Sequence, residues 1–373
     1  MINERTYQQC ARCVMDTTDP DIQFDPNGYC NHCTDHIRKT PLRSYRGNES
    51  NERFNAVIQK IKQKGKNKKY DCVMGVSGGL DSCYTAFLLK QHGLRPLLVH
   101  MDNGWDTPGS VQNIQNMVSK LSVDYESYVL DWEEFRDLQV AFLKASVIEA
   151  ETPTDMAIPA SLHRIAARHG VKFIVSGCNF ATEGILPKHW HYNSNDLVYL
   201  KGIHKRFADL PLKKFPVFGF WREAYYKFVK GIRMVYPLNE IPYSQQSARE
   251  LLVKEFQWKD HGGKHHESKF TAFIQSYLLP VKFDLDYRKA TLSSQICNGE
   301  KTREEAIEIL QSLPYDPGSI ETDIAYICKK LELTKEAFQK IMAAPPKTYK
   351  DYPNAERFLE PLYTIYRNLF SRK

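Results

Sequence analysis

The chain has 373 residues, nine cysteines and a formal charge of +7. This length predicts two or three domains with room for a large buried core. Hydrophobic residues make up 42% and charged residues 25% of the sequence, which argues against long disorder or a fibrous repeat. No apolar run is long enough to cross a bilayer, and the polar segment 1–9 lacks the apolar stretch of a signal peptide. We therefore expect a cytoplasmic protein without a membrane partner.

Four of the cysteines cluster near the start of the chain, as Cys10-Ala-Arg-Cys13 and Cys30-Asn-His-Cys33. Segment 1–40 has few apolar residues and many turn formers, so it cannot build an ordinary core. Two CxxC knuckles can place four thiolates around a zinc ion, whose binding energy would fold the segment. Such a site has no open position, so we expect structural zinc in a zinc-ribbon-like module. A redox pair or an iron–sulfur site is the alternative.

From residue 70 onward, short apolar runs alternate with helical patterns. Runs typical of buried strands cover 71–76, 97–101, 125–130 and 171–175. Helical patterns follow them over 80–93, 108–121, 132–149 and 153–169, the last with Thr152 and Asp155 as a capping box. This alternation predicts a Rossmann-like α/β domain with a parallel sheet over 41–243. The lysine-rich stretch 60–69 before it is either a solvated helix face or an anion-binding patch.

Beyond residue 244 the periodicity is mostly helical. Helical patterns cover 244–255, 268–278, 302–313, 319–331, 334–342 and 355–370. Thr302 and Glu305 form a capping box. We expect a helical domain over 244–373, which would bind the substrate or a partner.

A glycine-rich loop follows the first predicted strand. Its sequence is Ser77-Gly78-Gly79-Leu80-Asp81-Ser82. The glycines let backbone N–H groups turn toward a ligand, and the following helix start favours negative charge, so the loop is suited to a polyphosphate. No Gly-Lys-Ser/Thr follows, so it is not a Walker loop. Asp81 beside phosphates suggests a shared magnesium ion.

This loop resembles the SGGxDS fingerprint of the PP-loop ATP pyrophosphatases, which adenylate a carbonyl oxygen with ATP. The resemblance implies ATP at Ser77, Gly78, Gly79, Asp81 and Ser82. It also implies nucleotide contacts at the ends of two further strands, at Asp102, Gly177 and Asn179. Magnesium would be bound by Asp81 together with Glu183. On their own, Asp102 can equally be a turn former and Glu183 a surface carboxylate.

A second motif, Gly262-Gly263-Lys264-His265-His266-Glu267-Ser268, is followed by Arg288-Lys289-Ala290. Together with the CxxC pair and SGGLDS, it resembles the N-acetyl sugar amidotransferases of WbpG/PseA type, which act in bacterial surface-glycan synthesis. The resemblance covers nearly the whole chain. It implies that the N-acetyl oxygen of a nucleotide-linked sugar is adenylated and then replaced by ammonia. The products are an acetamidino sugar, AMP and pyrophosphate, for lipopolysaccharide O-antigen or flagellin glycans.

We assign the catalytic roles to Ser77, Asp81, Lys264, His265 and Glu267. The last three can instead belong to a polar interdomain loop, because no spacing rule fixes their roles. The adjacent histidines are not expected to be metal ligands. The sequence has no glutaminase signature, so the ammonia is expected from a partner resembling the glutaminase subunit of histidine biosynthesis.

Two other functions remain open at this stage. The first is a tRNA-modifying enzyme of thiolase or lysidine type, with the same adenylating core and with Cys178 or Cys297 as a sulfur carrier. A charge of +7 over 373 residues is a weak footprint for nucleic acid, which disfavours it. The second is a nucleotide-sensing or zinc-ribbon interaction module without catalysis.

Overall fold

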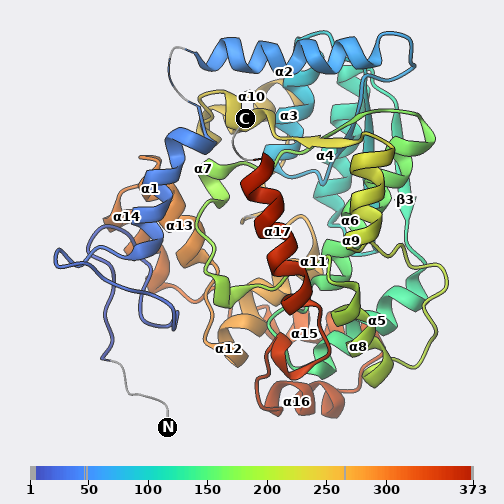
Figure 1. Cartoon of the computed structure of the whole chain (residues 1–373). Coiled ribbons are helices and arrows are strands. Elements are labelled where there is room, and N and C mark those ends of the chain that lie inside the picture. Colours follow the sequence, from blue (N-terminus) through green and yellow to red (C-terminus); the bar gives the residue numbers. More distant parts are fainter. Residues whose placement is uncertain (1–5, 46, 48, 264–265, 371–373) are drawn as a thin grey trace.

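The structure is a computed structural model that describes residues 6–45, 47, 49–263 and 266–370 (Figure 1). Its centre is one sheet of five parallel strands in the order β3-β2-β1-β4-β5. The strands are β1 (Cys72–Gly75), β2 (Pro96–Asp102), β3 (Tyr125–Val129), β4 (Phe173–Val175) and β5 (Arg233–Val235). The first four confirm the predicted strands and the Rossmann-like fold. The chain winds outward from β1 to β3 and then crosses to β4, so the loops after β1 and β4 diverge at a switch point where open α/β sheets bind ligands.

Helices cover both faces of this sheet. The helices of the α/β region are α2 (Ser50–Gly65), α3 (Leu80–Gln91), α4 (Pro108–Leu121), α5 (Trp132–Ala145), α6 (Thr152–Arg168), α7 (Phe180–Glu183), α8 (Leu197–Phe207), α9 (Phe220–Ala224) and the 3₁₀ turns η1 (Lys188–Trp190) and η3 (Pro237–Glu240). Alternate residues of β1 face opposite layers: Met74 packs with α2, α3 and α4, whereas Val73 packs with Leu162 and Ile165 of α6. The strands are therefore buried on both sides, as their continuous apolar runs predicted.

The C-terminal third is helical, as predicted. Its elements are α10 (Gln245–Phe256), α11 (Lys269–Phe273), α12 (Leu279–Phe283), α13 (Arg288–Cys297), α14 (Arg303–Gln311), α15 (Ile320–Leu331), α16 (Lys335–Ala343), the 3₁₀ turn η5 (Tyr349–Asp351) and α17 (Glu356–Phe370). A π turn, η4 (Ile274–Leu278), joins α11 to α12. The capping box of α14 is confirmed, with Thr302 and Glu305 bonded to each other's backbone N–H groups.

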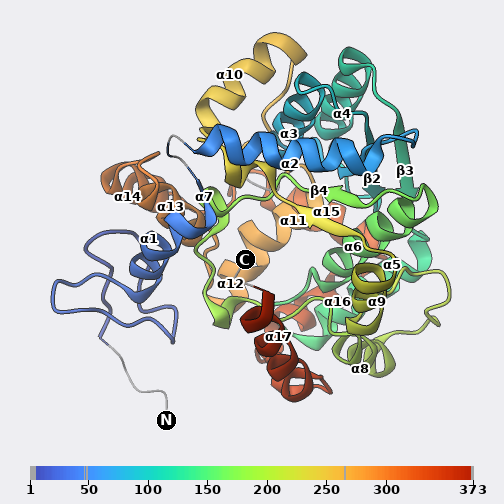
Figure 2. The same cartoon turned by 45° about the horizontal axis from the view of Figure 1, so that its top comes forward.

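The cysteine-rich segment leads into α1 (Asn31–Arg43) and lies against α13 and α14 (Figure 2). Val14 packs with Leu292 and Ala306, and the Arg303 guanidinium donates to the Cys10 carbonyl at 3.1 Å. The N-terminal module thus packs against the C-terminal helices α13 and α14. The domain boundaries at residues 40 and 243 stay predictions.

Several local predictions differ from the structure. The capping box at Thr152 is wrong, because Glu151 is the N-cap of α6 and makes no side-chain cap bond. The elements that were not predicted include α1 (Asn31–Arg43), α8, α13 and β5, of which β5 has only three residues. Among the residues described, no helix combines the length and the apolar character that a membrane crossing needs.

Candidate functional site

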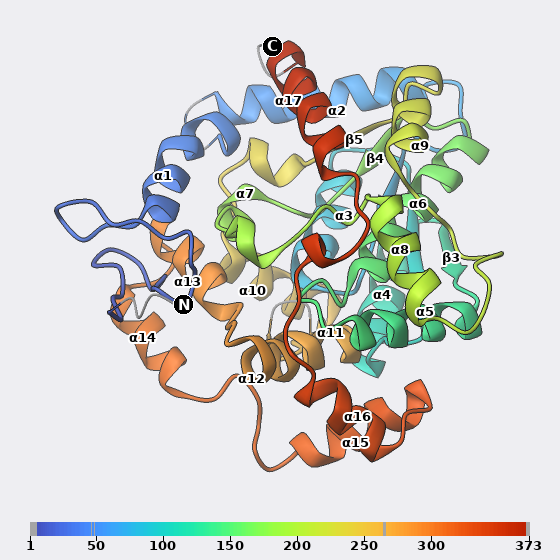
Figure 3. The same cartoon turned by 60° about the horizontal axis from the view of Figure 1, so that its bottom comes forward.

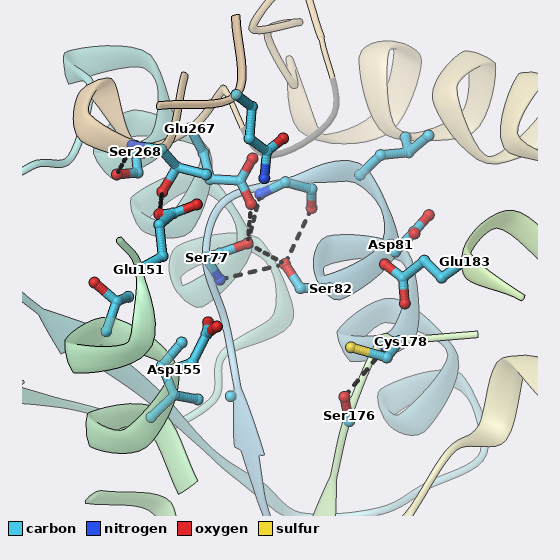
Figure 4. Close-up of a pocket in the computed structure, with 18 of the residues that line it drawn as sticks. Ser77, Asp81, Ser82, Glu151, Asp155, Ser176, Cys178, Glu183, Glu267 and Ser268 are labelled. Atoms are coloured by element: carbon cyan, nitrogen blue, oxygen red, sulfur yellow. Dashed lines mark hydrogen bonds between the residues drawn. The ribbon is translucent and has the colours of Figure 1, made fainter. Parts of the chain in front are cut away.

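A cavity of about 860 Å³ opens at the carboxyl end of the sheet, where β1 and β4 diverge. Figure 4 shows that the phosphate loop, the loop after β4 and the start of α6 surround it. The C-terminal helices close it, with residues of α11, η4, α12 and α13 in its wall. A cavity of this volume is large enough for a nucleotide and part of a second substrate.

The phosphate loop keeps its shape through its glycines. Gly78 has a φ of +81°, and a Cβ at this position would lie 2.4 Å from the Ser110 carbonyl oxygen. No other residue fits there without moving the backbone. The loop after β4 lies against the start of α3, because a Cβ at Gly177 would lie 2.8 Å from the Ser82 nitrogen. Both glycine loops therefore stand in contact at the predicted nucleotide site.

Hydroxyl groups line the inside of the phosphate loop. Ser82 Oγ donates to the Gly79 carbonyl at 3.0 Å, and the Gly79 N–H donates to Ser77 Oγ at 3.2 Å. The loop leads into α3, whose N-terminus favours anions. The predicted group of Ser77, Gly79 and Ser82 is brought together at the cavity wall.

Asp81 lies at the start of α3 and also lines the cavity. Its carboxylate accepts hydrogen bonds from the Tyr243 hydroxyl and, at 3.3 Å, from Asn179 Nδ2. Burial raises the pKa of Tyr243, and the Asp81 charge raises it further. Figure 4 shows the Glu183 carboxylate close to Asp81, so these two predicted magnesium ligands share one side of the cavity. Two carboxylates from adjacent loops are a donor set that suits Mg²⁺.

The second sequence motif reaches the phosphate loop through Glu267. Ser77 Oγ donates to Glu267 Oε1 at 2.9 Å, and the Glu267 carbonyl accepts from the Thr107 N–H at 2.9 Å. His266 is directed elsewhere: its Nε2 lies 3.3 Å from Ser276 Oγ. The other two predicted residues of this motif, Lys264 and His265, lie outside the described residues.

The segment after β2 contacts the cavity through residues that were not predicted. Asp102 accepts a hydrogen bond from the Gly104 N–H at 2.8 Å and shapes a turn, whereas Asn103 and Asp106 line the cavity. His100 Nε2 lies 2.8 Å from Asp106 Oδ2. Burial alone would lower the pKa of His100, but the Asp106 carboxylate outweighs it and raises that pKa. The Asp106 carboxylate therefore favours the charged form of this imidazole at the cavity wall.

Three further carboxyl groups, named here the acidic wall, line the same cavity near the start of α6. Burial raises the pKa of Glu149 to about 7 and that of Asp155 to about 6. Burial and the neighbouring Asp155 charge raise the pKa of Glu151 to about 8. All three line the cavity. They are therefore poised to exchange protons near neutral pH.

Aromatic side chains stand beside this acidic wall. Trp190, Tyr192 and Tyr287 line the same cavity, and the rings of Trp190 and Tyr287 lie 5.8 Å apart. Carboxylates with aromatic rings make a surface that can hold hydroxyl groups and the apolar face of a sugar. The sequence held a signal for the wall, because Glu149, Glu151 and Asp155 fall within seven residues. The sequence pattern placed Glu149 at the end of one predicted helix and Asp155 at the start of the next, and gave Glu151 no role.

The four N-terminal cysteines converge as predicted. All four sulfur atoms lie within 4.8 Å of one another and are buried, with Cys10 and Cys33 at 3.8 Å and Cys13 and Cys30 at 3.6 Å. Metal–sulfur bonds of ~2.3 Å in a tetrahedron place sulfur atoms ~3.8 Å apart, so the cluster fits a metal ion. Backbone N–H groups also point at the sulfurs, as at Cys30 N and Cys10 Sγ, 3.2 Å apart. The cluster is therefore a four-cysteine metal site.

The structure also places one tryptophan and two cysteines outside the N-terminal cluster. Trp105 is fully buried and donates through its indole N–H to Gln139, so it is a core residue and cannot stack on a base. Cys178 is exposed in the cavity, whereas Cys297 contacts Cys33 beside the metal cluster.

Comparisons with known proteins bear mainly on the C-terminal helices. Residues 267–368 match the family model described as "LPS biosynthesis protein WbpG-like, C-terminal domain". No curated protein matches the chain.

Similar solved structures are distant. NMN synthetase from Francisella tularensis has 11% identity and a TM-score of 0.30, over 55% of this chain and 95% of that one. The NH₃-dependent NAD synthetase from Campylobacter jejuni has 15% identity and a TM-score of 0.29, over 55% and 87%. The U34-tRNA thiolase NcsA from Methanococcus maripaludis has 14% identity and a TM-score of 0.31, over 82% and 88%.

The family match starts at Glu267, the residue that contacts the phosphate loop, and includes all of α11 to α16. It thus covers the helices that close the cavity. Residues 267–368 are therefore similar to the C-terminal domain of WbpG-like proteins, in agreement with the resemblance in the sequence.

Proposed function

We propose that this protein is an ATP-dependent amidotransferase that converts the N-acetyl group of a nucleotide-linked sugar into an acetamidino group. One observation carries the proposal: a single cavity joins the phosphate loop to a wall built from the WbpG-like helices. ATP and an acceptor bound there would lie side by side. The proposed setting is the cytoplasm, in the synthesis of O-antigen or flagellin glycans.

In the proposed first step the N-acetyl oxygen attacks the α-phosphorus of ATP. The bond from that phosphorus to the bridging oxygen breaks, and pyrophosphate leaves. The loop N–H groups and the Ser77 and Ser82 hydroxyls hold the phosphates through this charge shift. Magnesium bound by Asp81 and Glu183 would neutralise charge on the leaving pyrophosphate.

In the second step the lone pair of ammonia attacks the adenylated carbon. The carbon–oxygen bond to AMP breaks, and an amidine remains. Ammonium must lose a proton before it attacks, and Glu151 or Asp155 can accept it because their pKa values lie near neutrality. The amidine product is a cation, and the acidic wall stabilises it. No side-chain nucleophile is needed.

The ammonia is proposed to come from a separate glutaminase, which resembles the subunit of histidine biosynthesis. The four-cysteine site is proposed to hold structural zinc. Its protein ligands fill a tetrahedron and leave no position for substrate.

The test supplies ATP, magnesium and ammonium salt with a panel of UDP- and CMP-linked N-acetyl sugars. AMP, pyrophosphate and a product in which NH replaces one acetamido oxygen are expected, with the product identified by mass spectrometry. Controls omit ammonium or use the corresponding amino sugar without its N-acetyl group, which has no amide oxygen to adenylate. AMP formation whose rate is the same with and without each sugar would contradict the proposal.

One observation favours a tRNA-modifying function as a second candidate. Cys178 is exposed in the cavity, where a persulfide could meet an adenylated base. Transfer RNA in the same assay, with Cys178→Ser as the variant, separates the two. Turnover that depends on tRNA and is lost in this variant supports the second function, whereas turnover that depends on sugar and survives it supports the first.

A further inference from the structure

The segment before the edge strand β5 carries an apolar face that points away from the core. α9 continues into a π turn, η2 (Tyr225–Val229), and Figure 3 shows α9 at the outer margin of the molecule. Trp221 is 73% exposed, Phe228 63% and Val229 70%, with Tyr225 exposed between them. These residues, named here the aromatic ridge, recur at helical spacing and so share one side of the segment.

The opposite side of this segment is anchored in the protein. The ring of Tyr226 packs on His163 of α6 and stacks with Phe218. Phe220 contacts Phe358 and Tyr363 of α17. These contacts fix the orientation of the segment, so the aromatic ridge faces away from the protein. An exposed contiguous apolar face of this kind marks an interaction surface.

Lysines border the ridge and connect it to the end of α2. Lys172 Nζ donates to the Lys230 carbonyl at 2.5 Å, and Lys68 Nζ donates to the Gly170 carbonyl. Burial lowers the pKa of Lys68, and the charges of Lys172 and Lys64 lower it further, so these ammonium groups repel one another. Lys64, Lys68, Lys172 and Lys230, named here the lysine cluster, therefore form a surface that an anionic partner would stabilise. It includes part of the lysine-rich stretch 60–69.

The combination of ridge and cluster limits the partner. A second copy of this chain would bring lysines against lysines, which is unfavourable at close range. Protein interfaces are enriched in aromatic residues and arginine but depleted in lysine. Aromatic residues flanked by lysines are typical of segments that lie in the surface plane of an anionic bilayer. The aromatic rings enter the headgroup region while the lysines meet the lipid phosphates.

We propose that the aromatic ridge and the lysine cluster dock this protein on the surface of a bilayer that contains anionic lipid. The contact is peripheral, with Trp221 and Phe228 inserted at headgroup depth. It differs from the expectation of no membrane partner, and it is independent of the sugar and of the reaction proposed above.

The test is co-sedimentation of the full chain with vesicles of phosphatidylglycerol and phosphatidylethanolamine, compared with vesicles of phosphatidylcholine alone. Binding to the anionic vesicles is expected, with strong weakening at 0.5 M salt because exposed charges are screened. Trp221→Ser with Phe228→Ser is expected to lower binding at least tenfold. Lys68→Glu with Lys230→Glu is expected to lower it by a similar factor, since each surface lysine contributes about fivefold.

Matched controls change equally exposed residues elsewhere, with Leu42→Ser for the apolar pair and Lys254→Glu for the charged pair. Both controls should bind as the unchanged chain does. Thermal melting and ATP binding check that each variant is folded. The proposal fails if the unchanged chain ignores anionic vesicles, or if the Trp221/Phe228 variant binds them equally well. A chain that binds soluble polyglutamate but no vesicle, or forms a dimer that this variant abolishes, also overturns it.

Discussion

The Ser77 hydroxyl donates a hydrogen bond to the Glu267 carboxylate, 190 positions later in the chain, with 2.9 Å between the oxygens. The contact joins the phosphate loop to the first residue of the WbpG-like domain. It puts a negative charge beside a loop suited to phosphates. ATP binding and the position of the C-terminal helices are therefore expected to be coupled.

The first prediction concerns that charge. Glu267→Gln keeps the size of the side chain but removes its repulsion of the triphosphate. In EDTA, where no cation links the carboxylate to the phosphates, the Kd for ATP should fall several-fold by titration calorimetry. Glu250→Gln, on the exposed side of α10, is the matched control. An unchanged Kd would mean that Glu267 leaves the loop when ATP binds.

The second prediction concerns Asp81, which accepts from the Tyr243 hydroxyl. Asp81→Asn should lower turnover roughly 10²–10³-fold, because the site loses the proposed magnesium ligand. Tyr243→Phe should lower it less, about tenfold, since the carboxylate stays but is no longer oriented. AMP release measures both rates, and thermal melting checks the fold. Full activity in Asp81→Asn would show that the phosphate-loop assignment is wrong.

The parts of this site that the sequence predicted are those with local causes. The turn at Gly78 and the knuckle at Cys10 and Cys13 depend on neighbouring residues, so a short motif carries them. Tyr243 and Glu151 are different, because their roles arise only when α10 and α6 are packed around the sheet. Their side chains have no fixed spacing from the phosphate loop. A single sequence therefore cannot place them.

The third prediction concerns pH and stability. Burial raises the pKa of Glu151 from its ordinary 4.5 to about 8, so the folded chain holds this proton more tightly than the unfolded chain. The free energy of unfolding that depends on Glu151 is therefore largest below pH 4.5 and is lost as the pH rises toward 8. Glu151→Gln cannot ionise and escapes this loss.

The melting temperature of Glu151→Gln relative to the unchanged chain should therefore increase from pH 5 to pH 8, by several degrees. Glu250→Gln, whose carboxylate is exposed, should show no such trend. Calorimetric scans at four pH values between these limits give the comparison. A constant difference would mean that water in the cavity solvates Glu151 as well as bulk water does.

The fourth prediction concerns the metal. Purified protein should contain one zinc ion per chain by elemental analysis, and Cys10→Ser should lose it, because three thiolates bind zinc far more weakly than four. Cys328→Ser, a buried thiol outside the cluster, should keep the full metal content. Iron with sulfide in place of zinc would make the cluster an iron–sulfur site.

The loss of metal should also reach the C-terminal helices, because Arg303 donates to the Cys10 and Cys13 carbonyls and the Val14 N–H donates to Ser293. Hydrogen exchange in α13 and α14 should therefore speed up in Cys10→Ser, while β1 and β2 stay protected. Faster exchange confined to the first 40 residues would show that the module is held by its metal alone. Faster exchange in α13 and α14 would show that the metal cluster stabilises helices that form part of the cavity wall.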